Sequence, residues 1–155
     1  MRKFETLALV ILIVVVPAVV VAPVRSSSEF TVLKVYWGAD QPIEVSPGDV
    51  ATLTVVLRYE QSWSFSNLKA VLSLPKGFKA VGGDSVATIY YTRPISIGSI
   101  VELGFPLFIT SNVNKSAYRA TLDLEYYISQ YVIPKQNFEI TFEVTGKPKI
   151  EASFV

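Results

Sequence analysis

The sequence predicts an all-β domain in which two antiparallel sheets pack as a sandwich, preceded by a hydrophobic N-terminal segment. Three observations support this fold class. Apolar and polar residues alternate along most of the chain after residue 30, turn-forming residues separate the alternating segments, and no window there has the spacing of an amphipathic helix. Strands with one apolar face must bury that face against another sheet, which favours two packed layers.

The first 22 residues have the pattern of a targeting or anchoring segment. Arg2 and Lys3 give a basic start, and residues 7–16 are all apolar, as are residues 18–22. Such a segment is either a secretory signal peptide that is cleaved or a short helix that stays in the membrane. With either alternative, we expect the rest of the chain to be exported to the cell surface or beyond, with residues 23–29 as a short linker.

The exported part is predicted to be one neutral domain. Residues 1–22 hold two basic residues and one acidic residue, so 12 of each sign remain. A chain of this length is long enough for one core and too short for two. The neutral charge gives no reason to expect nucleic acid as a partner.

The whole sequence contains no His and no Cys. Their absence excludes disulfides, His or Cys metal sites and catalysis by Ser-His or Cys-His groups. We therefore expect no catalytic residue, no cofactor and no metal ion, and a fold that packing alone stabilises.

Alternation places the strands between residues 30 and 146. In residues 50–59, for example, Leu53, Val55 and Leu57 share one face while Thr52 and Thr54 share the other, which is the period of a half-buried strand. We predict seven to nine strands, near residues 30–38, 43–46, 50–59, 66–75, 78–82, 86–93, 97–109, 117–129 and 133–145.

Turn residues and prolines indicate where these strands begin and end. The segments 46–49 and 75–77 each contain Pro followed by a Gly that can adopt positive φ, which is typical of tight turns. Pro106 and Pro134 have no N–H to donate to a neighbouring strand. We therefore expect them at a sheet edge, a bulge or the start of a strand.

Three stretches of the domain carry a family resemblance. They are Val45 to Val55, Asn67 to Phe78, and the region from Ile97 through Phe105 and Ile109 to Tyr118 and Tyr126. Together they resemble the immunoglobulin-like modules of archaeal cell-surface and S-layer-associated proteins, of the CARDB and NEW3 types. The chain departs from the commoner pattern at Ala117, where that pattern has Gly. The resemblance implies an immunoglobulin-like sandwich with an adhesive, spacer or assembly role and without enzymatic activity.

Residues 147–155 resume the alternation after the domain has reached an end. Gly146 and Pro148 interrupt the pattern, and Ile150, Ala152 and Phe154 then alternate with polar residues. Three interpretations remain open. The segment is a further strand of the same sandwich, the first strand of a following module, or a donor strand that pairs with a neighbouring subunit.

Few surface residues are candidates for a site. Asn114 begins the sequence Asn-Lys-Ser in a predicted turn of an exported protein, so it is either a glycosylation site or an unmodified turn residue. Trp63 lies in a polar stretch between two strands, and we predict that it contacts a partner together with Phe65. Ile150 and Phe154 are the candidate contacts of the last segment.

Two further patterns have a structural explanation beside a functional one. Asp123 and Glu125 share a strand face whose carboxylates are of the type that binds calcium, but the solvated face of a sheet explains them better. The pairs Tyr90-Tyr91 and Tyr126-Tyr127 are candidates for a sugar-stacking platform. In an alternating strand, however, one residue of each adjacent pair faces the core.

The sequence therefore predicts a non-enzymatic extracellular module of the cell envelope, such as an S-layer-associated stalk, anchor or assembly subunit. Its expected partners are other envelope proteins or copies of itself, with the membrane involved only through residues 1–22 if these stay attached. The alternatives are a module that recognises carbohydrate or protein, and a pilus or thread subunit that assembles by donor strands.

Overall fold

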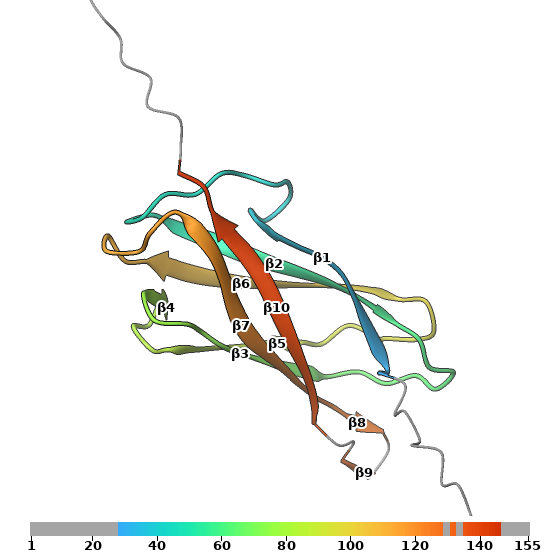
Figure 1. Cartoon of the computed structure of the whole chain (residues 1–155). Coiled ribbons are helices and arrows are strands. Elements are labelled where there is room, and N and C mark those ends of the chain that lie inside the picture. The colour runs from blue at the N-terminus through green and yellow to red at the C-terminus, as the bar shows by residue number, and fades with distance from the viewer. Residues whose placement is uncertain (1–27, 129–130, 133–134, 147–155) are drawn as a thin grey trace, which may run out of the picture.

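The computed structural model describes residues 28–128, 131–132 and 135–146, and all regular structure in these residues is β (Figure 1). The strands are β1 (Phe30–Trp37), β2 (Val50–Tyr59), β3 (Leu68–Ser73), β4 (Phe78–Ala80), β5 (Val86–Tyr91), β6 (Ile100–Ile109), β7 (Ser116–Glu125), β8 (Tyr127–Ile128), β9 (Tyr131–Val132) and β10 (Gln136–Val144). The described part contains no helix long and apolar enough to cross a membrane. The N-terminal segment, most of the linker and residues 147–155 lie outside the described residues.

The strands form two antiparallel sheets of four strands, which pack as a β-sandwich. One sheet has the order β1-β2-β6-β4 and the other has the order β10-β7-β3-β5, while β8 and β9 form a small hairpin at one end. The prediction of an all-β fold with two antiparallel sheets is confirmed. The turn glycines Gly48 and Gly77 adopt φ values of 92° and 95°, as their place after Pro predicted.

Most predicted strands appear with shortened ends, but the one at residues 43–46 is wrong. This segment is a loop, in which the Ile43 N–H donates to the carbonyl of Trp37 at 2.7 Å. The carbonyl of Val45 accepts from the Gly146 N–H at 2.8 Å, and the Val45 side chain is buried. Single hydrogen bonds with Trp37 and Gly146 thus satisfy backbone groups of this loop, whereas we expected a neighbouring strand to pair with them.

The core lies between the sheets and uses the inward faces that alternation predicted. Its members with no exposed surface include Leu53, Leu57, Leu72, Leu103, Leu107, Leu122 and Leu124. Trp37 links the sheets, because its indole Nε1 donates to the carbonyl of Glu143 at 2.8 Å and its ring packs edge-on against Phe142, with ring centroids 5.5 Å apart. Each fully buried side chain of this size contributes about 1.5–3 kcal/mol, which is how a domain without disulfides is stabilised.

Pro106 lies at an open edge within β6. The Ile109 N–H donates to the carbonyl of Asp49 next to β2. Because N–H groups alternate between the two sides of a strand, the nitrogen of Pro106 faces away from β2. The strand on that side, β4, has already ended, since Ala80 pairs with Leu107. The expected edge position of Pro106 is confirmed, and β6 is unpaired there from Ile100 to Pro106; Pro134 lies outside the described residues.

Candidate functional site

The edge strand β5 is the part of the sandwich most open to a partner. Natural edge strands avoid unwanted pairing by charge, shortness, Pro or a bulge. Here β1 has a register shift between Val32 and Lys34, β4 has only three residues, and β10 exposes Glu139 and Glu143. By contrast, β5 has the sequence Val-Ala-Thr-Ile-Tyr-Tyr, with no charge, no Pro and an unbroken register with β3.

Three residues of β5 present their backbone to this open side. The carbonyl of Ser85 accepts from the Leu74 N–H at 2.9 Å, so Ser85 and every second residue after it point their backbone groups toward β3. Val86, Thr88 and Tyr90 therefore direct their N–H and C=O groups outward. Their side chains are also exposed, Val86 by 42% and Tyr90 by 70%.

The side of the sandwich along β5 is hollowed. One hollow of about 450 Å³ is lined by Tyr90, Tyr91, Thr92, Arg93, Ile100 and Glu102. A second of about 360 Å³ is lined by residues 80–82, Asp84, residues 86–89 and Pro106. Both lie between β5 and the unpaired part of β6, so described residues leave this edge uncovered.

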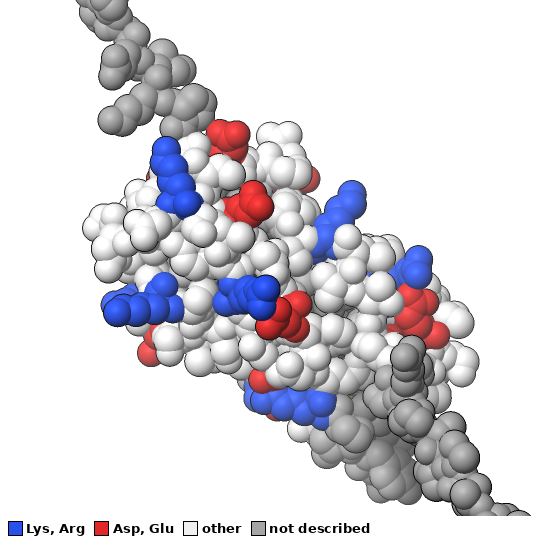
Figure 2. All heavy atoms as spheres, viewed as in Figure 1, with Lys and Arg blue, Asp and Glu red and all other residues white. Residues whose placement is uncertain are grey.

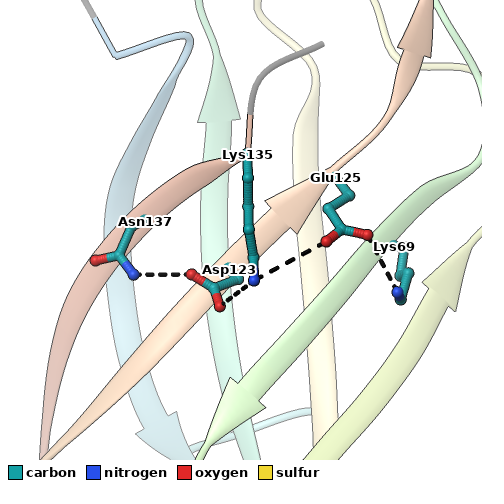
Figure 3. Close-up of polar contacts among 5 residues, drawn as sticks. All are labelled: Lys69, Asp123, Glu125, Lys135 and Asn137. Carbon is teal, nitrogen blue, oxygen red and sulfur yellow. Dashed lines mark hydrogen bonds and ion pairs between the residues drawn. The ribbon is translucent and has the colours of Figure 1, made fainter. Parts of the chain in front are cut away.

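The outer face of the same sheet carries charged and polar side chains that pair across β3, β7 and the start of β10. On the face drawn in Figure 2, basic and acidic side chains lie next to one another. The carboxylate of Asp123 accepts from Lys135 at 2.8 Å and from Asn137 at 2.8 Å, and Glu125 accepts from Lys69 at 3.1 Å (Figure 3). The hydrogen bond with Glu125 raises the pKa of Lys69.

This arrangement bears on the calcium alternative. The Lys135 ammonium is 2.8 Å from Asp123 Oδ2 and 3.9 Å from Glu125 Oε1, so it occupies the place between the carboxylates that a cation would need (Figure 3). Among the described residues, no group of three or more acidic side chains is arranged to hold a metal ion. The two carboxylates belong to a solvated sheet face that lysines neutralise.

An aromatic cluster with buried polar atoms closes one end of the sandwich. The rings of Tyr59, Phe65 and Tyr126 pack together, with 4.1 Å between the centroids of Phe65 and Tyr126. Burial, aided by the Glu29 carboxylate, raises the pKa of Tyr59 to about 12, and the Tyr59 hydroxyl has no hydrogen-bond partner among the described residues. Burial also raises the pKa of Glu29, while a hydrogen bond with Gln136 lowers it by less.

Asn114 lies in an exposed turn between β6 and β7 that Tyr118 holds in place. The Tyr118 hydroxyl donates to the Asn114 carbonyl at 2.9 Å and accepts from the Asn114 N–H at 3.1 Å. Both bonds use the backbone of Asn114, and its side chain is exposed. The turn therefore presents the Asn-Lys-Ser sequence to solvent, as a glycosylation site requires.

The other predicted contact residues differ in how exposed they are. Trp63 is 41% exposed, so its ring is accessible to a partner. Phe65 is only 8% exposed, and the expectation that it contacts a partner does not fit its burial in the aromatic cluster. Its N–H donates to the carbonyl of the buried Ile95 at 3.0 Å, and this bond holds the backbone of Phe65 next to the core. Ile150 and Phe154 lie outside the described residues.

The tyrosine pairs divide between core and surface as expected. Tyr126 is buried and Tyr127 is 55% exposed, while Tyr91 is half-buried and Tyr90 is exposed. Sequence reasoning missed the role of β5 as the unprotected edge. The signal was present, since an uncharged run of six residues from Val86 to Tyr91 is unusual for an edge strand.

No family model matches the chain, and neither does any curated protein.

Proposed function

We propose that the chain is a non-enzymatic, extracellular structural module of the cell envelope, such as an S-layer-associated stalk, anchor or assembly subunit. The observation that carries the proposal is the unprotected edge of β5. Soluble domains that act alone protect their edges, whereas a subunit that assembles through main-chain hydrogen bonds needs one open edge. The hydrophobic N-terminal segment supports export of the domain.

The arrangement of the strands supports the immunoglobulin-like part of the proposal. In the immunoglobulin fold, one sheet has the order A-B-E-D and the other contains G-F-C. The orders β1-β2-β6-β4 and β10-β7-β3 correspond to these, with β5 added beside β3. Tyr118, at the start of β7, makes the bond to an upstream backbone that is called the tyrosine corner in such domains.

Surface labelling of intact cells tests the proposed location. A biotinylating reagent that cannot cross the membrane reacts with exposed lysines, of which the domain offers Lys79 and Lys115 among others. We expect the chain to be labelled on intact cells and to remain with the envelope fraction after lysis. A cytosolic protein of the same cells serves as the reference, because it is labelled only when the cells are broken. If the chain is likewise labelled only after lysis, the proposal is contradicted.

Carbohydrate recognition is the second candidate function, and the larger hollow favours it. An exposed tyrosine ring, a guanidinium and a carboxylate meet there, in Tyr90, Arg93 and Glu102. Aromatic rings stack on sugar faces, and charged groups bind hydroxyls. A glycan array tests this function: we expect specific retention that Tyr90→Ala abolishes and that Tyr127→Ala, a control at another exposed tyrosine, leaves unchanged. Absence of retention by the unaltered chain would rule it out.

A further inference from the structure

We infer that β5 pairs with β5 of a second copy of this chain, antiparallel and about a two-fold axis at Thr88. This inference rests on the proposed function, since it names the partner of the open edge. The pairing joins the two β10-β7-β3-β5 sheets into one continuous sheet of eight strands. A two-fold interface uses the same surface of both copies, so the surface must be complementary to itself.

The backbone of β5 meets this requirement. Val86, Thr88 and Tyr90 point their N–H and C=O groups to the open side. With the axis at Thr88, these residues face Tyr90, Thr88 and Val86 of the second copy. Each opposed pair exchanges two hydrogen bonds, so every outward backbone group of the strand finds a partner. A shift by two residues in either direction leaves one outward residue of β5 without a partner in the opposite strand.

The exposed side chains suit the same register. Thr88 meets Thr88 of the second copy, and Val86 meets Tyr90 of that copy. Thr–Thr pairs and pairs of an aromatic with a β-branched residue are both favourable across strands. The exposed apolar surface of Val86 and Tyr90 is thereby covered.

Charge also favours this edge over the others. A two-fold pairing centred on Thr141 of β10 would place the exposed Glu139 opposite the exposed Glu143 of the second copy, which is unfavourable. The strand β5 holds no charge. Beyond its ends, the register places Asp84 opposite Thr92 and beside Arg93 of the second copy. Asp84 and Arg93 are exposed and make no ion pair among the described residues, and the register brings no two like charges together at the ends of the strand.

Disulfide trapping tests the register, because the natural sequence has no cysteine. In a hydrogen-bonded antiparallel pair, opposed Cα atoms are about 5.5 Å apart, which is within the range of a disulfide. We expect Thr88→Cys to give a product of twice the chain's mass when whole cells are mildly oxidised. Val86→Cys is the matched control: its two copies lie four residues apart along the strand, about 14 Å, and should not cross-link.

The outcomes separate this inference from the proposed function. Failure of Thr88→Cys to cross-link, or cross-linking of Val86→Cys instead, overturns the pairing at Thr88. If the chain is nevertheless labelled on intact cells, the proposed location stands. If the chain is labelled only after lysis but Thr88→Cys still cross-links, the pairing stands and the proposed function fails.

Sedimentation of the protein extracted from the envelope gives a second measurement. Thr88→Lys places two ammonium groups together at the axis, whereas Thr141→Lys adds the same charge to β10 between Glu139 and Glu143. We expect the unaltered chain and Thr141→Lys to sediment as dimers and Thr88→Lys to sediment as a monomer. Equal sedimentation of all three proteins overturns the inference.

Discussion

The hydroxyl of Tyr118 both donates to the carbonyl of Asn114 and accepts from its N–H, at 2.9 and 3.1 Å. One side chain at the start of β7 thus satisfies both backbone groups of a residue in the preceding turn. The ring of Tyr118 packs against Phe78 of the other sheet, with centroids 4.8 Å apart. Tyr118 therefore ties the turn between β6 and β7 to the core, together with Val113 of the same turn, whose side chain is buried.

We expect Tyr118→Phe to lower the free energy of unfolding by about 1–2 kcal/mol, since it removes two hydrogen bonds and keeps the ring. Chemical denaturation measures the change. Tyr127→Phe is the control, because the exposed Tyr127 makes no such bridge among the described residues. Equal stability of Tyr118→Phe and the unaltered chain would show that the hydroxyl contributes nothing.

The substitution Asn114→Gln should remove any glycan without affecting the fold. The bonds to Tyr118 use the backbone of Asn114, so a changed side chain leaves them in place. Mass spectrometry of the protein from its native cells should show added mass on the unaltered chain and none on the variant, with equal thermal midpoints. A native mass equal to that of the bare polypeptide would show that the asparagine is unmodified.

Stability should fall as the pH rises through the pKa of Glu29. Burial raises this pKa in the folded protein, so the folded state holds the proton more tightly than the unfolded state does. The contribution of Glu29 is then fully present below the unfolded value of 4.5 and is lost above the folded pKa. We expect Glu29→Gln to raise the thermal midpoint at pH 7 relative to the unaltered chain, and to do so less at pH 4. A benefit that grows on acidification would contradict this sign.

Calcium and chelators should leave the thermal midpoint unchanged. Lysine ammonium groups already neutralise Asp123 and Glu125, so a cation would have to displace Lys135. Lys135→Met should cost no more than about 1 kcal/mol, because the pair is partly exposed. Differential scanning calorimetry with calcium and with EDTA measures both effects. A higher thermal midpoint of the unaltered chain in the presence of calcium would support a metal site at Asp123 and Glu125.

Local pattern predicted the strands well where one face is fully buried. In β6 and β10, apolar and polar residues alternate over many positions, so the sequence determines which face of each strand is buried. It failed at residues 43–46, where an apolar residue, Val45, is buried by a loop that forms no ladder. A short segment has too few residues for its period to separate a strand from a buried loop.

The candidate sites depend on contacts between distant segments, which the sequence does not display. The sequence predicts that Phe65 contacts a partner together with Trp63, yet its backbone pairs with Ile95 and its side chain is buried. Lys135 meets Asp123 only because β10 pairs with β7. Similarly, the sequence shows that β5 is uncharged, but only the strand order shows that it lies at an edge.

The link between Trp37 and Glu143 bears on how the domain responds to mechanical force. The described chain enters β1 at one end of the sandwich and leaves β10 at the other (Figure 1). A pull between these points runs along the strands, at right angles to their hydrogen bonds, so the bonds of β1 with β2 resist in shear and break together. The indole bond to Glu143 adds a tie between the two loaded strands. Under such a pull, the hydrogen bonds between β1 and β2 have to break together before the domain can extend.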